Sequence, residues 1–162
     1  MKYLKVIMTK TPYTNSILKQ HENILSVAKV TKWILIAPIF VMIISLLLTS
    51  VFFEDIRVNH ELNIFLLFGP FLLLYAIKQF IENLIYIFTT EMVLTNERVI
   101  YKTGLIQRYT TEIPINQIES VNVKQNILGR ILRFGDIDII GTGSTNQHLK
   151  YIANIMKFKQ KI

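Results

Sequence analysis

The sequence TNERVIYKTGLIQRYTTEIPINQIESVNVKQNILGRILRFGDIDIIGTG, which runs from residue 95 to residue 143, decides the fold of this chain. Short apolar runs alternate in it with turn residues, which is the pattern of short antiparallel strands. In the segment 105–113, one face is formed by Leu105, Gln107, Tyr109, Thr111 and Ile113. Arg108, Thr110 and Glu112 lie on the other face, so we expect a half-buried strand, and Pro114 ends it or marks an edge.

The same pattern continues on both sides of this segment. Further strands are predicted at residues 92–94, 99–101, 118–123, 136–140 and 148–153, the last two as a hairpin, with a helical turn at 127–133. The period then changes, because Ile155, Phe158 and Ile162 are spaced three and four apart, as on one face of a helix that Asn154 can cap. We therefore expect a small barrel or curled sheet with a terminal helix packed on it.

Two long apolar runs precede the strands. Residues 33–53 carry no charge, and as a helix they would span roughly 32 Å, enough to cross a bilayer. A signal peptide is the competing interpretation. However, signal peptides have a shorter apolar core followed by a cleavage site of small residues, and no such site follows residue 53. The second span is predicted at about 62–86 and includes Lys78 and Glu82, which would share a helix face. The chain should therefore contain a transmembrane helical hairpin at 33–88.

Charge sets the expected orientation of this hairpin. Six lysines precede the first span, at positions 2, 5, 10, 19, 29 and 32, whereas the connection 54–61 holds one arginine and three acids. Lysine and arginine in short flanks favour the cytoplasmic side. We expect a multi-pass protein of the cytoplasmic membrane with both termini in the cytoplasm. Its parts are a segment 1–32, the hairpin and a cytoplasmic domain 89–162.

At this point the sequence resembles the bacterial pleckstrin-homology (PH) domain family, in its membrane-anchored branch with two N-terminal transmembrane helices. The resemblance covers roughly residues 15–162, and it rests on Thr95-Asn96-x-Arg98, Gly104, Glu112-Ile113-Pro114, Ile118-Glu119-Ser120-Val121, Gln125, Leu128-Gly129-Arg130, Gly135 and Gly141-Thr142-Gly143. It implies a mainly-β, PH-like barrel of about seven bent strands, plugged by a C-terminal α-helix. Arg133 departs from the pattern, where a small residue is commoner, and the tail after Ile155 is short.

The residues give little sign of chemistry. A phosphate loop would need a Gly-Lys-Ser/Thr signature and a helix after Gly143, whereas a strand-like segment follows, so a hairpin turn is predicted. The chain has no cysteine, its three histidines fall in separate regions, and Asp136 and Asp138 are expected on a solvated strand face. We expect no enzyme activity, cofactor, metal or small-molecule substrate. The net charge of +7 comes from an excess of basic residues both before the first span and after residue 89, and it requires no nucleic-acid partner.

Seven basic residues of the predicted domain are candidates for contact with lipid or a partner: Arg98, Lys102, Arg108, Lys124, Arg130, Arg133 and Lys150. Two functions remain open. The first is a non-catalytic module that assembles with itself or with another membrane protein at the cytoplasmic membrane surface. The second is an anionic-lipid-binding module that uses the basic face of the barrel, since anionic lipids attract lysine and arginine.

Overall fold

A computed structural model of the chain describes residues 12–59, 68–142 and 146–162. The chain divides into two compact units. The β unit contains the described residues up to Thr31 together with Tyr86–Ile162, and the helical unit contains Lys32–Ile85. Residues from both sides of the helical unit thus belong to the β unit.

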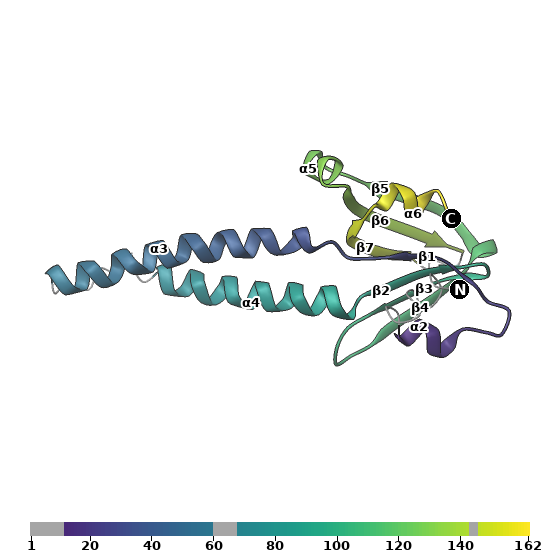
Figure 1. The fold of residues 1–162 in the computed structure, drawn as a ribbon, viewed down its shortest axis with the longest axis horizontal. Coiled ribbons are helices and arrows are strands. Elements are labelled where there is room, and N and C mark those ends of the chain that lie inside the picture. The colour runs from purple at the N-terminus through teal and green to yellow at the C-terminus, as the bar shows by residue number, and fades with distance from the viewer. Residues whose placement is uncertain (1–11, 60–67, 143–145) are drawn as a thin grey trace, which may run out of the picture. The chain divides into compact units, whose positions relative to one another are not determined.

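Two antiparallel sheets form the β unit (Figure 1). The first has the order β1 (Ile24–Ala28), β2 (Glu91–Thr95), β3 (Arg98–Thr103) and β4 (Tyr109–Pro114); the second has the order β5 (Ile118–Lys124), β6 (Phe134–Gly141) and β7 (Asn146–Ala153). Short helices complete the unit: α2 (Pro12–Ile17), η3 (Ile115–Gln117), α5 (Ile127–Ile131) and α6 (Ile155–Lys159). This mainly-β arrangement is consistent with the PH-like fold that the resemblance implies.

The core of the β unit follows from the alternation along its strands. In β6, Ile137 and Ile139 are fully buried, whereas Asp136 and Asp138, which alternate with them, are only partly covered. Ile155 and Phe158 of α6 are buried in the same cluster, and Ile162 packs against it. The predicted strand 136–140, its hairpin with 148–153 and the apolar face of the terminal helix are confirmed. Asn154 precedes α6 in the left-handed region, with φ 52°, and its side chain makes no capping bond.

The structure differs from the prediction at several points. The predicted strand 105–113 begins only at Tyr109, because Gly104, with φ +95°, starts a turn and leaves Leu105 exposed. Pro114 does end this strand, which lies at the edge of its sheet. The segment before the first span supplies β1, which pairs with β2, whereas no strand was predicted there. The predicted connection 54–61 is helical as far as Asn59, and the rest of it lies outside the described residues.

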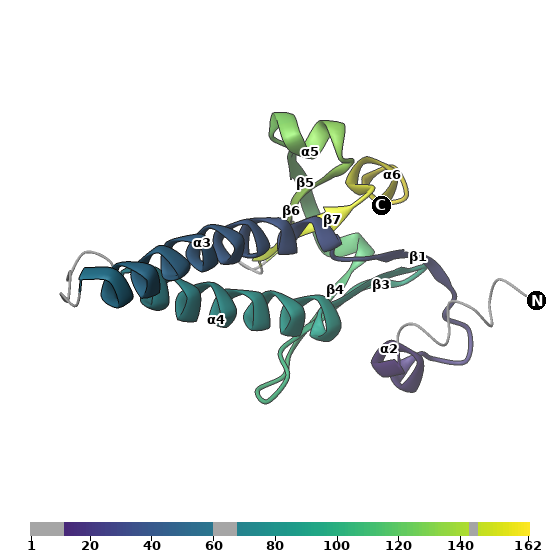
Figure 2. The same cartoon turned by 60° about the vertical axis from the view of Figure 1, so that its left-hand side comes forward.

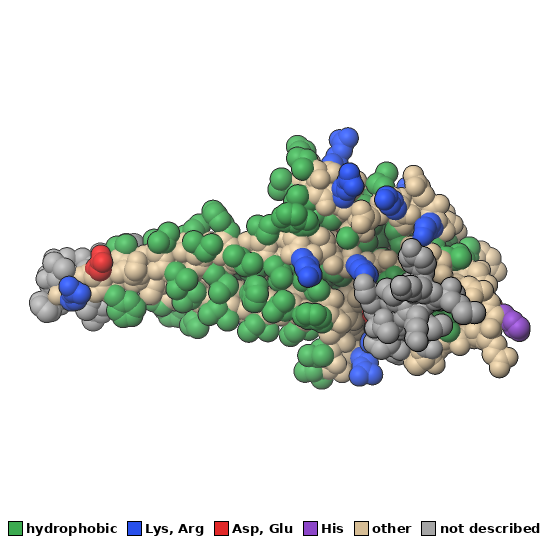
Figure 3. Space-filling model, viewed as in Figure 1, with side chains coloured by type: hydrophobic (Ala, Val, Ile, Leu, Met, Phe, Trp, Pro, Cys, Tyr) green, Lys and Arg blue, Asp and Glu red, His purple; other side chains and the backbone are tan. Residues whose placement is uncertain are grey.

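The helical unit contains η1 (Lys32–Leu35), α3 (Ile36–Asn59) and α4 (Phe68–Thr89), whose last turn belongs to the β unit. Residues 32–51 and 68–89 form two helices that are long and apolar enough to cross a membrane. Most of their apolar side chains are exposed (Figure 3). Lys78 and Glu82 form the expected ion pair at 3.2 Å. Asn83 donates a hydrogen bond of 3.1 Å to the carbonyl oxygen of Ile34, which links the two helical segments at one end.

Candidate functional site

The chain leaves the β unit after Thr31 and returns at Tyr86, and both points are bonded to β7. The amide of Thr31 donates to the carbonyl oxygen of Tyr151 at 2.6 Å. The Tyr86 hydroxyl accepts from the amide of Lys150 at 3.3 Å and lies 3.4 Å from its carbonyl oxygen. We call the end of the β unit at Thr31, Tyr86 and this part of β7 the junction end.

Helix α5 forms the tight connection between β5 and β6 (Figure 2). Asn126 caps the helix, since its side-chain oxygen accepts from the amide of Gly129 at 2.6 Å. Gln125 donates to the carbonyl oxygen of Phe134 at 2.8 Å. A Cβ at Gly129 would lie 2.6 Å from that same carbonyl oxygen, so the corner requires glycine. These bonds give a structural reason for the motif residues around α5.

A cavity of about 340 Å³ lies between this corner and α6. It is lined by Gln125, Arg130, Arg133, Asn154, Ile155, Met156 and Lys157. No carboxylate is among these residues, and within the described parts of the chain no ion pair engages the three cations. Arg133 and Asn154 both have positive φ, at 57° and 52°, and the amide of Asn154 donates to the carbonyl oxygen of Arg133 at 2.7 Å. We call this group the basic cavity, and its charges suit an anion such as a phosphate.

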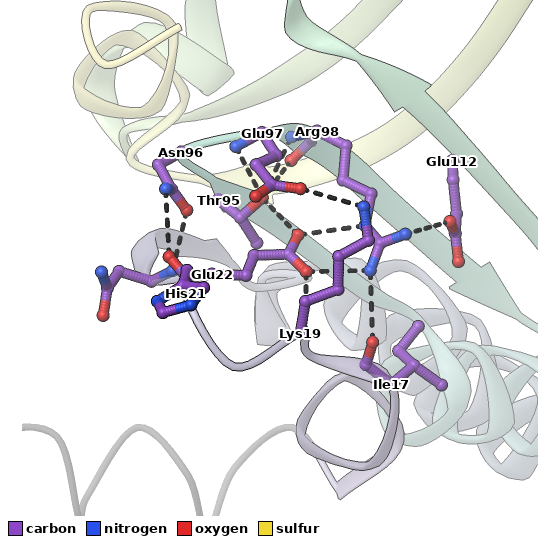
Figure 4. Close-up of polar contacts among 10 residues, drawn as sticks. Ile17, Lys19, His21, Glu22, Thr95, Asn96, Glu97, Arg98 and Glu112 are labelled. Atoms are coloured by element: carbon purple, nitrogen blue, oxygen red, sulfur yellow. Dashed lines mark hydrogen bonds and ion pairs between the residues drawn. The ribbon is translucent and has the colours of Figure 1, made fainter.

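Arg98 lies elsewhere, in a network that ties the segment before the first span to the β2–β3 turn (Figure 4). Its guanidinium binds Glu22 at 2.9 and 3.0 Å and Glu112 at 2.7 Å. The Glu22 side chain is fully buried and accepts from the Thr95 hydroxyl at 2.7 Å. Asn96 accepts from the amide of Asn23 at 2.8 Å. Arg98 is therefore part of an internal bond network, unlike Arg108, Arg130 and Arg133, which are exposed.

The electrostatics of this network favour a charged Glu22. Burial opposes ionisation of the carboxyl, but hydrogen bonds from Thr95 and Arg98, together with the positive charge of Arg98, outweigh it and lower the pKa of Glu22 below its ordinary 4.5. The pair thus stays ionised at neutral pH. Sequence reasoning missed this role of Glu22, although it is the one acid among six lysines before the first span.

Asp138 was expected to face solvent with no histidine near it, and this prediction is wrong. The β6–β7 register places His148 directly opposite, and its Nδ1 bonds Asp138, which Lys124 also approaches at 3.4 Å. The hydrogen bond with His148 lowers the pKa of Asp138. Within the described residues, no group of three potential metal-ligating side chains exists. We interpret this contact as a cross-strand pair.

The remaining candidate residues do not converge on one site. Lys102 lies on β3 opposite Glu91, Arg108 lies in the β3–β4 turn, and Lys150 lies beside Tyr86. Arg130 and Arg133 do come together, at the basic cavity. Lys157 joins them there and was not among the seven candidates. The glycine-rich segment is the connection of the β6–β7 hairpin, as predicted, although Gly143 lies outside the described residues.

Comparison with known proteins identifies the family. A family model described as bacterial PH domain matches residues 23–160, well over half of the chain. This match begins just before β1 and ends just after α6, so it includes the strand that precedes the two apolar helices. No curated protein and no solved structure was found to match the chain. The chain belongs to the bacterial PH domain family.

Proposed function

We propose that this member of the bacterial PH domain family is a non-catalytic interaction module that two membrane spans hold at the cytoplasmic membrane surface. In this proposal α3 and α4 form a transmembrane hairpin, and both termini are cytoplasmic. The β unit would assemble with a second copy or with another membrane protein. The hairpin already provides membrane affinity, which leaves the surface of the β unit available to partners.

One observation carries the topology. Strand β1 precedes the first apolar helix and pairs with β2, which follows the second, through Val27 opposite Val93 and Ala28 opposite Met92. Two strands of one sheet must lie on the same side of a membrane. An even number of crossings between them satisfies this requirement, and two candidate spans supply it. The lysines before the first span favour the cytoplasm as that side.

The contacts of the β unit support a binding role over a catalytic one. The charged groups of the Arg98 network are engaged with each other, which suits a structural tie. The basic cavity offers cations and amides, but its lining has no carboxylate, hydroxyl or histidine to act as a base or nucleophile. Such a site can hold an anion, and Lys157 is the one side chain in its lining that could also exchange a proton.

Reporter fusions test the topology. A fluorescent protein that folds only in the cytoplasm should be active after Ile162, and alkaline phosphatase, active only outside, should work when inserted after residue 57. Phosphatase activity at Ile162 would refute the proposed orientation. Purification in mild detergent, with mass measurement of the complex, then tests assembly, and a lone monomer with no co-purified protein would contradict it.

Anionic-lipid binding is a second candidate function, and the basic cavity favours it. Arg130, Arg133 and Lys157 would attract phosphate-bearing headgroups of the inner leaflet, each by about 1 kcal/mol. Salt should weaken such binding, whereas an apolar protein interface responds little to salt.

A further inference from the structure

Helix α5 exposes an unusual amount of apolar surface. Ile127 is 78% exposed, Leu128 is 62% exposed and Ile131 is 71% exposed, all within five residues. Single exposed apolar residues are normal, but a contiguous group of large ones marks a surface that contacts something apolar. Met156, which lines the basic cavity, is 54% exposed and extends this surface. Figure 3 shows apolar and basic side chains next to each other over α5.

Strand register places α5 at the junction end. The helix connects β5 to β6, and Gly135 at the start of β6 pairs with Ile152 of β7. The next residue, Asp136, accepts from the amide of Tyr151 at 2.9 Å, and the carbonyl oxygen of Tyr151 accepts from Thr31. Only a few residues along paired strands thus separate α5 from the point where the chain enters the first candidate span.

A second apolar tip lies at the same end. The β3–β4 turn exposes Leu105 and Ile106, the latter at 93%. The hydroxyl of Thr103, at the end of β3, lies 3.2 Å from the hydroxyl of Thr90, which directly follows α4. Two apolar tips therefore occur where the chain passes between the β unit and the candidate spans.

One of the arginines that line the basic cavity has an unusual backbone conformation. Arg133 has φ 57°, a conformation that is unfavourable for a residue with a side chain and that glycine adopts freely. The side chain of this arginine lines the basic cavity, where it can contact a bound anion. Arginine also suits phosphate because its planar fork can donate two parallel hydrogen bonds.

We infer that α5 inserts into the membrane interface and that the basic cavity beside it binds the phosphate of an anionic phospholipid. This inference rests on the proposed anchoring of the chain by α3 and α4. Apolar side chains flanked by arginine and lysine are typical of segments that lie in the interface, where the cations meet headgroups. A bilayer fits both apolar tips at once, because each lies at the junction end.

The absence of cysteine makes a direct test simple. The full-length Leu128→Cys protein is labelled with an environment-sensitive fluorophore and reconstituted into phosphatidylcholine vesicles with or without phosphatidylglycerol. Doxyl-labelled lipid should quench the label, and more strongly when phosphatidylglycerol is present. A label at Asn146→Cys, at the opposite end of the β6–β7 hairpin, should not be quenched.

Charge variants identify the headgroup site. Arg133→Asn suits the positive φ and should keep the fold while shifting the ratio of inserted to free α5 about fivefold toward the free state. Lys157→Gln should have a similar effect, whereas Lys159→Gln on the same helix, outside the cavity lining, should have little. The headgroup site would be overturned if the label were quenched equally in vesicles with and without phosphatidylglycerol. Equal effects of Lys157→Gln and Lys159→Gln on quenching would also overturn it.

Two further outcomes would overturn the insertion itself. In the first, doxyl-labelled lipid does not quench the label at position 128, although the protein resists extraction by carbonate. That result would refute the insertion of α5 and leave the anchoring proposal intact. The second is a label that aqueous iodide cannot reach when each vesicle holds several copies of the protein, but that iodide quenches when each vesicle holds only one copy. That result would assign α5 to contact with a second copy. Release of the protein by carbonate would instead refute the anchoring.

Discussion

The network around Glu22 makes a sharp prediction about what holds the pre-span segment to the β unit. Glu22→Gln preserves the shape of the side chain but removes its charge. The amide nitrogen then faces Arg98, Lys19 or Thr95, which donate to the native carboxylate at 2.9, 3.2 and 2.7 Å. Arg98 would keep only Glu112 as an ionic partner, and Glu112 is 38% exposed.

The magnitude follows from burial. Removing one partner of a buried charge pair costs about 3–5 kcal/mol, and losing one hydrogen bond to a charged group costs about 1.5–3 kcal/mol. The Glu22 side chain is fully buried but Arg98 is 15% exposed, so solvent screens part of the loss. We expect Glu22→Gln to cost about 2–4 kcal/mol of the free energy that keeps β1 docked.

Hydrogen exchange of the full-length protein in lipid nanodiscs measures this effect. Amides of β1 should exchange at least roughly 30-fold faster in Glu22→Gln, because 2 kcal/mol corresponds to that factor. Glu97→Gln is the matched control. It removes the Lys19–Glu97 pair, whose side chains are 62% and 40% exposed, and should change exchange less than about fivefold. Equal protection of β1 in the two variants would refute the structural role of Glu22.

Three further predictions concern the β unit. Because the native pKa of Glu22 is lowered, its stabilisation should be complete above about pH 4.5 and lost as pH falls through the native pKa; thermal melts in which wild-type and Glu22→Gln proteins differ equally at pH 3 and pH 7 would contradict this. Phe158→Asp should unfold or aggregate the β unit without preventing membrane insertion, since burial of Phe158 contributes roughly 1.5–3 kcal/mol; a folded variant by hydrogen exchange would disprove it. Gly104→Val and Gly129→Val should each cost at least roughly 1–3 kcal/mol, whereas Asp138→Asn should cost less than about 1 kcal/mol because its partners are exposed; unfolding midpoints in the reverse order would count against this.

Features encoded within a few residues were predictable. The alternation in 136–140 and the spacing of Ile155, Phe158 and Ile162 reflect burial of one face of a local element, and both were found from the sequence. The pairing of Asp138 with His148 could also have been found. The β6–β7 register that sets Ile140 opposite Asn146 sets these two residues opposite each other.

Features that depend on distant partners were not predictable. The segment that forms β1 has no turn signal of its own, and its pairing with β2 crosses the whole helical unit. Glu22 and Arg98 are 76 positions apart, so no local period relates them. The basic cavity also needs the tertiary structure, because it joins Arg130 and Arg133 to Lys157 from a separate helix. The positive φ of Arg133 follows from the tight corner after α5 and leaves no mark in the spacing of residues.

Under the proposed transmembrane topology, the position of the helical unit within the chain links membrane insertion to folding of the β unit. More than sixty residues separate Ala28 from its partner Met92, and closing a flexible loop of that length costs roughly 4 kcal/mol. The bond from Asn83 to Ile34 joins the two helical segments at one end, so a formed hairpin leaves only short free segments to close, at a cost of roughly 2–3 kcal/mol. The β1–β2 pairing should therefore follow insertion of both spans. Because Thr31 and Tyr86 are then bonded to neighbouring residues of β7, the completed sheet fixes both ends of the hairpin to one strand. Under the proposed topology, a β unit built in this way would fold with its junction end already connected to both spans, which is the setting that the proposed insertion of α5 requires.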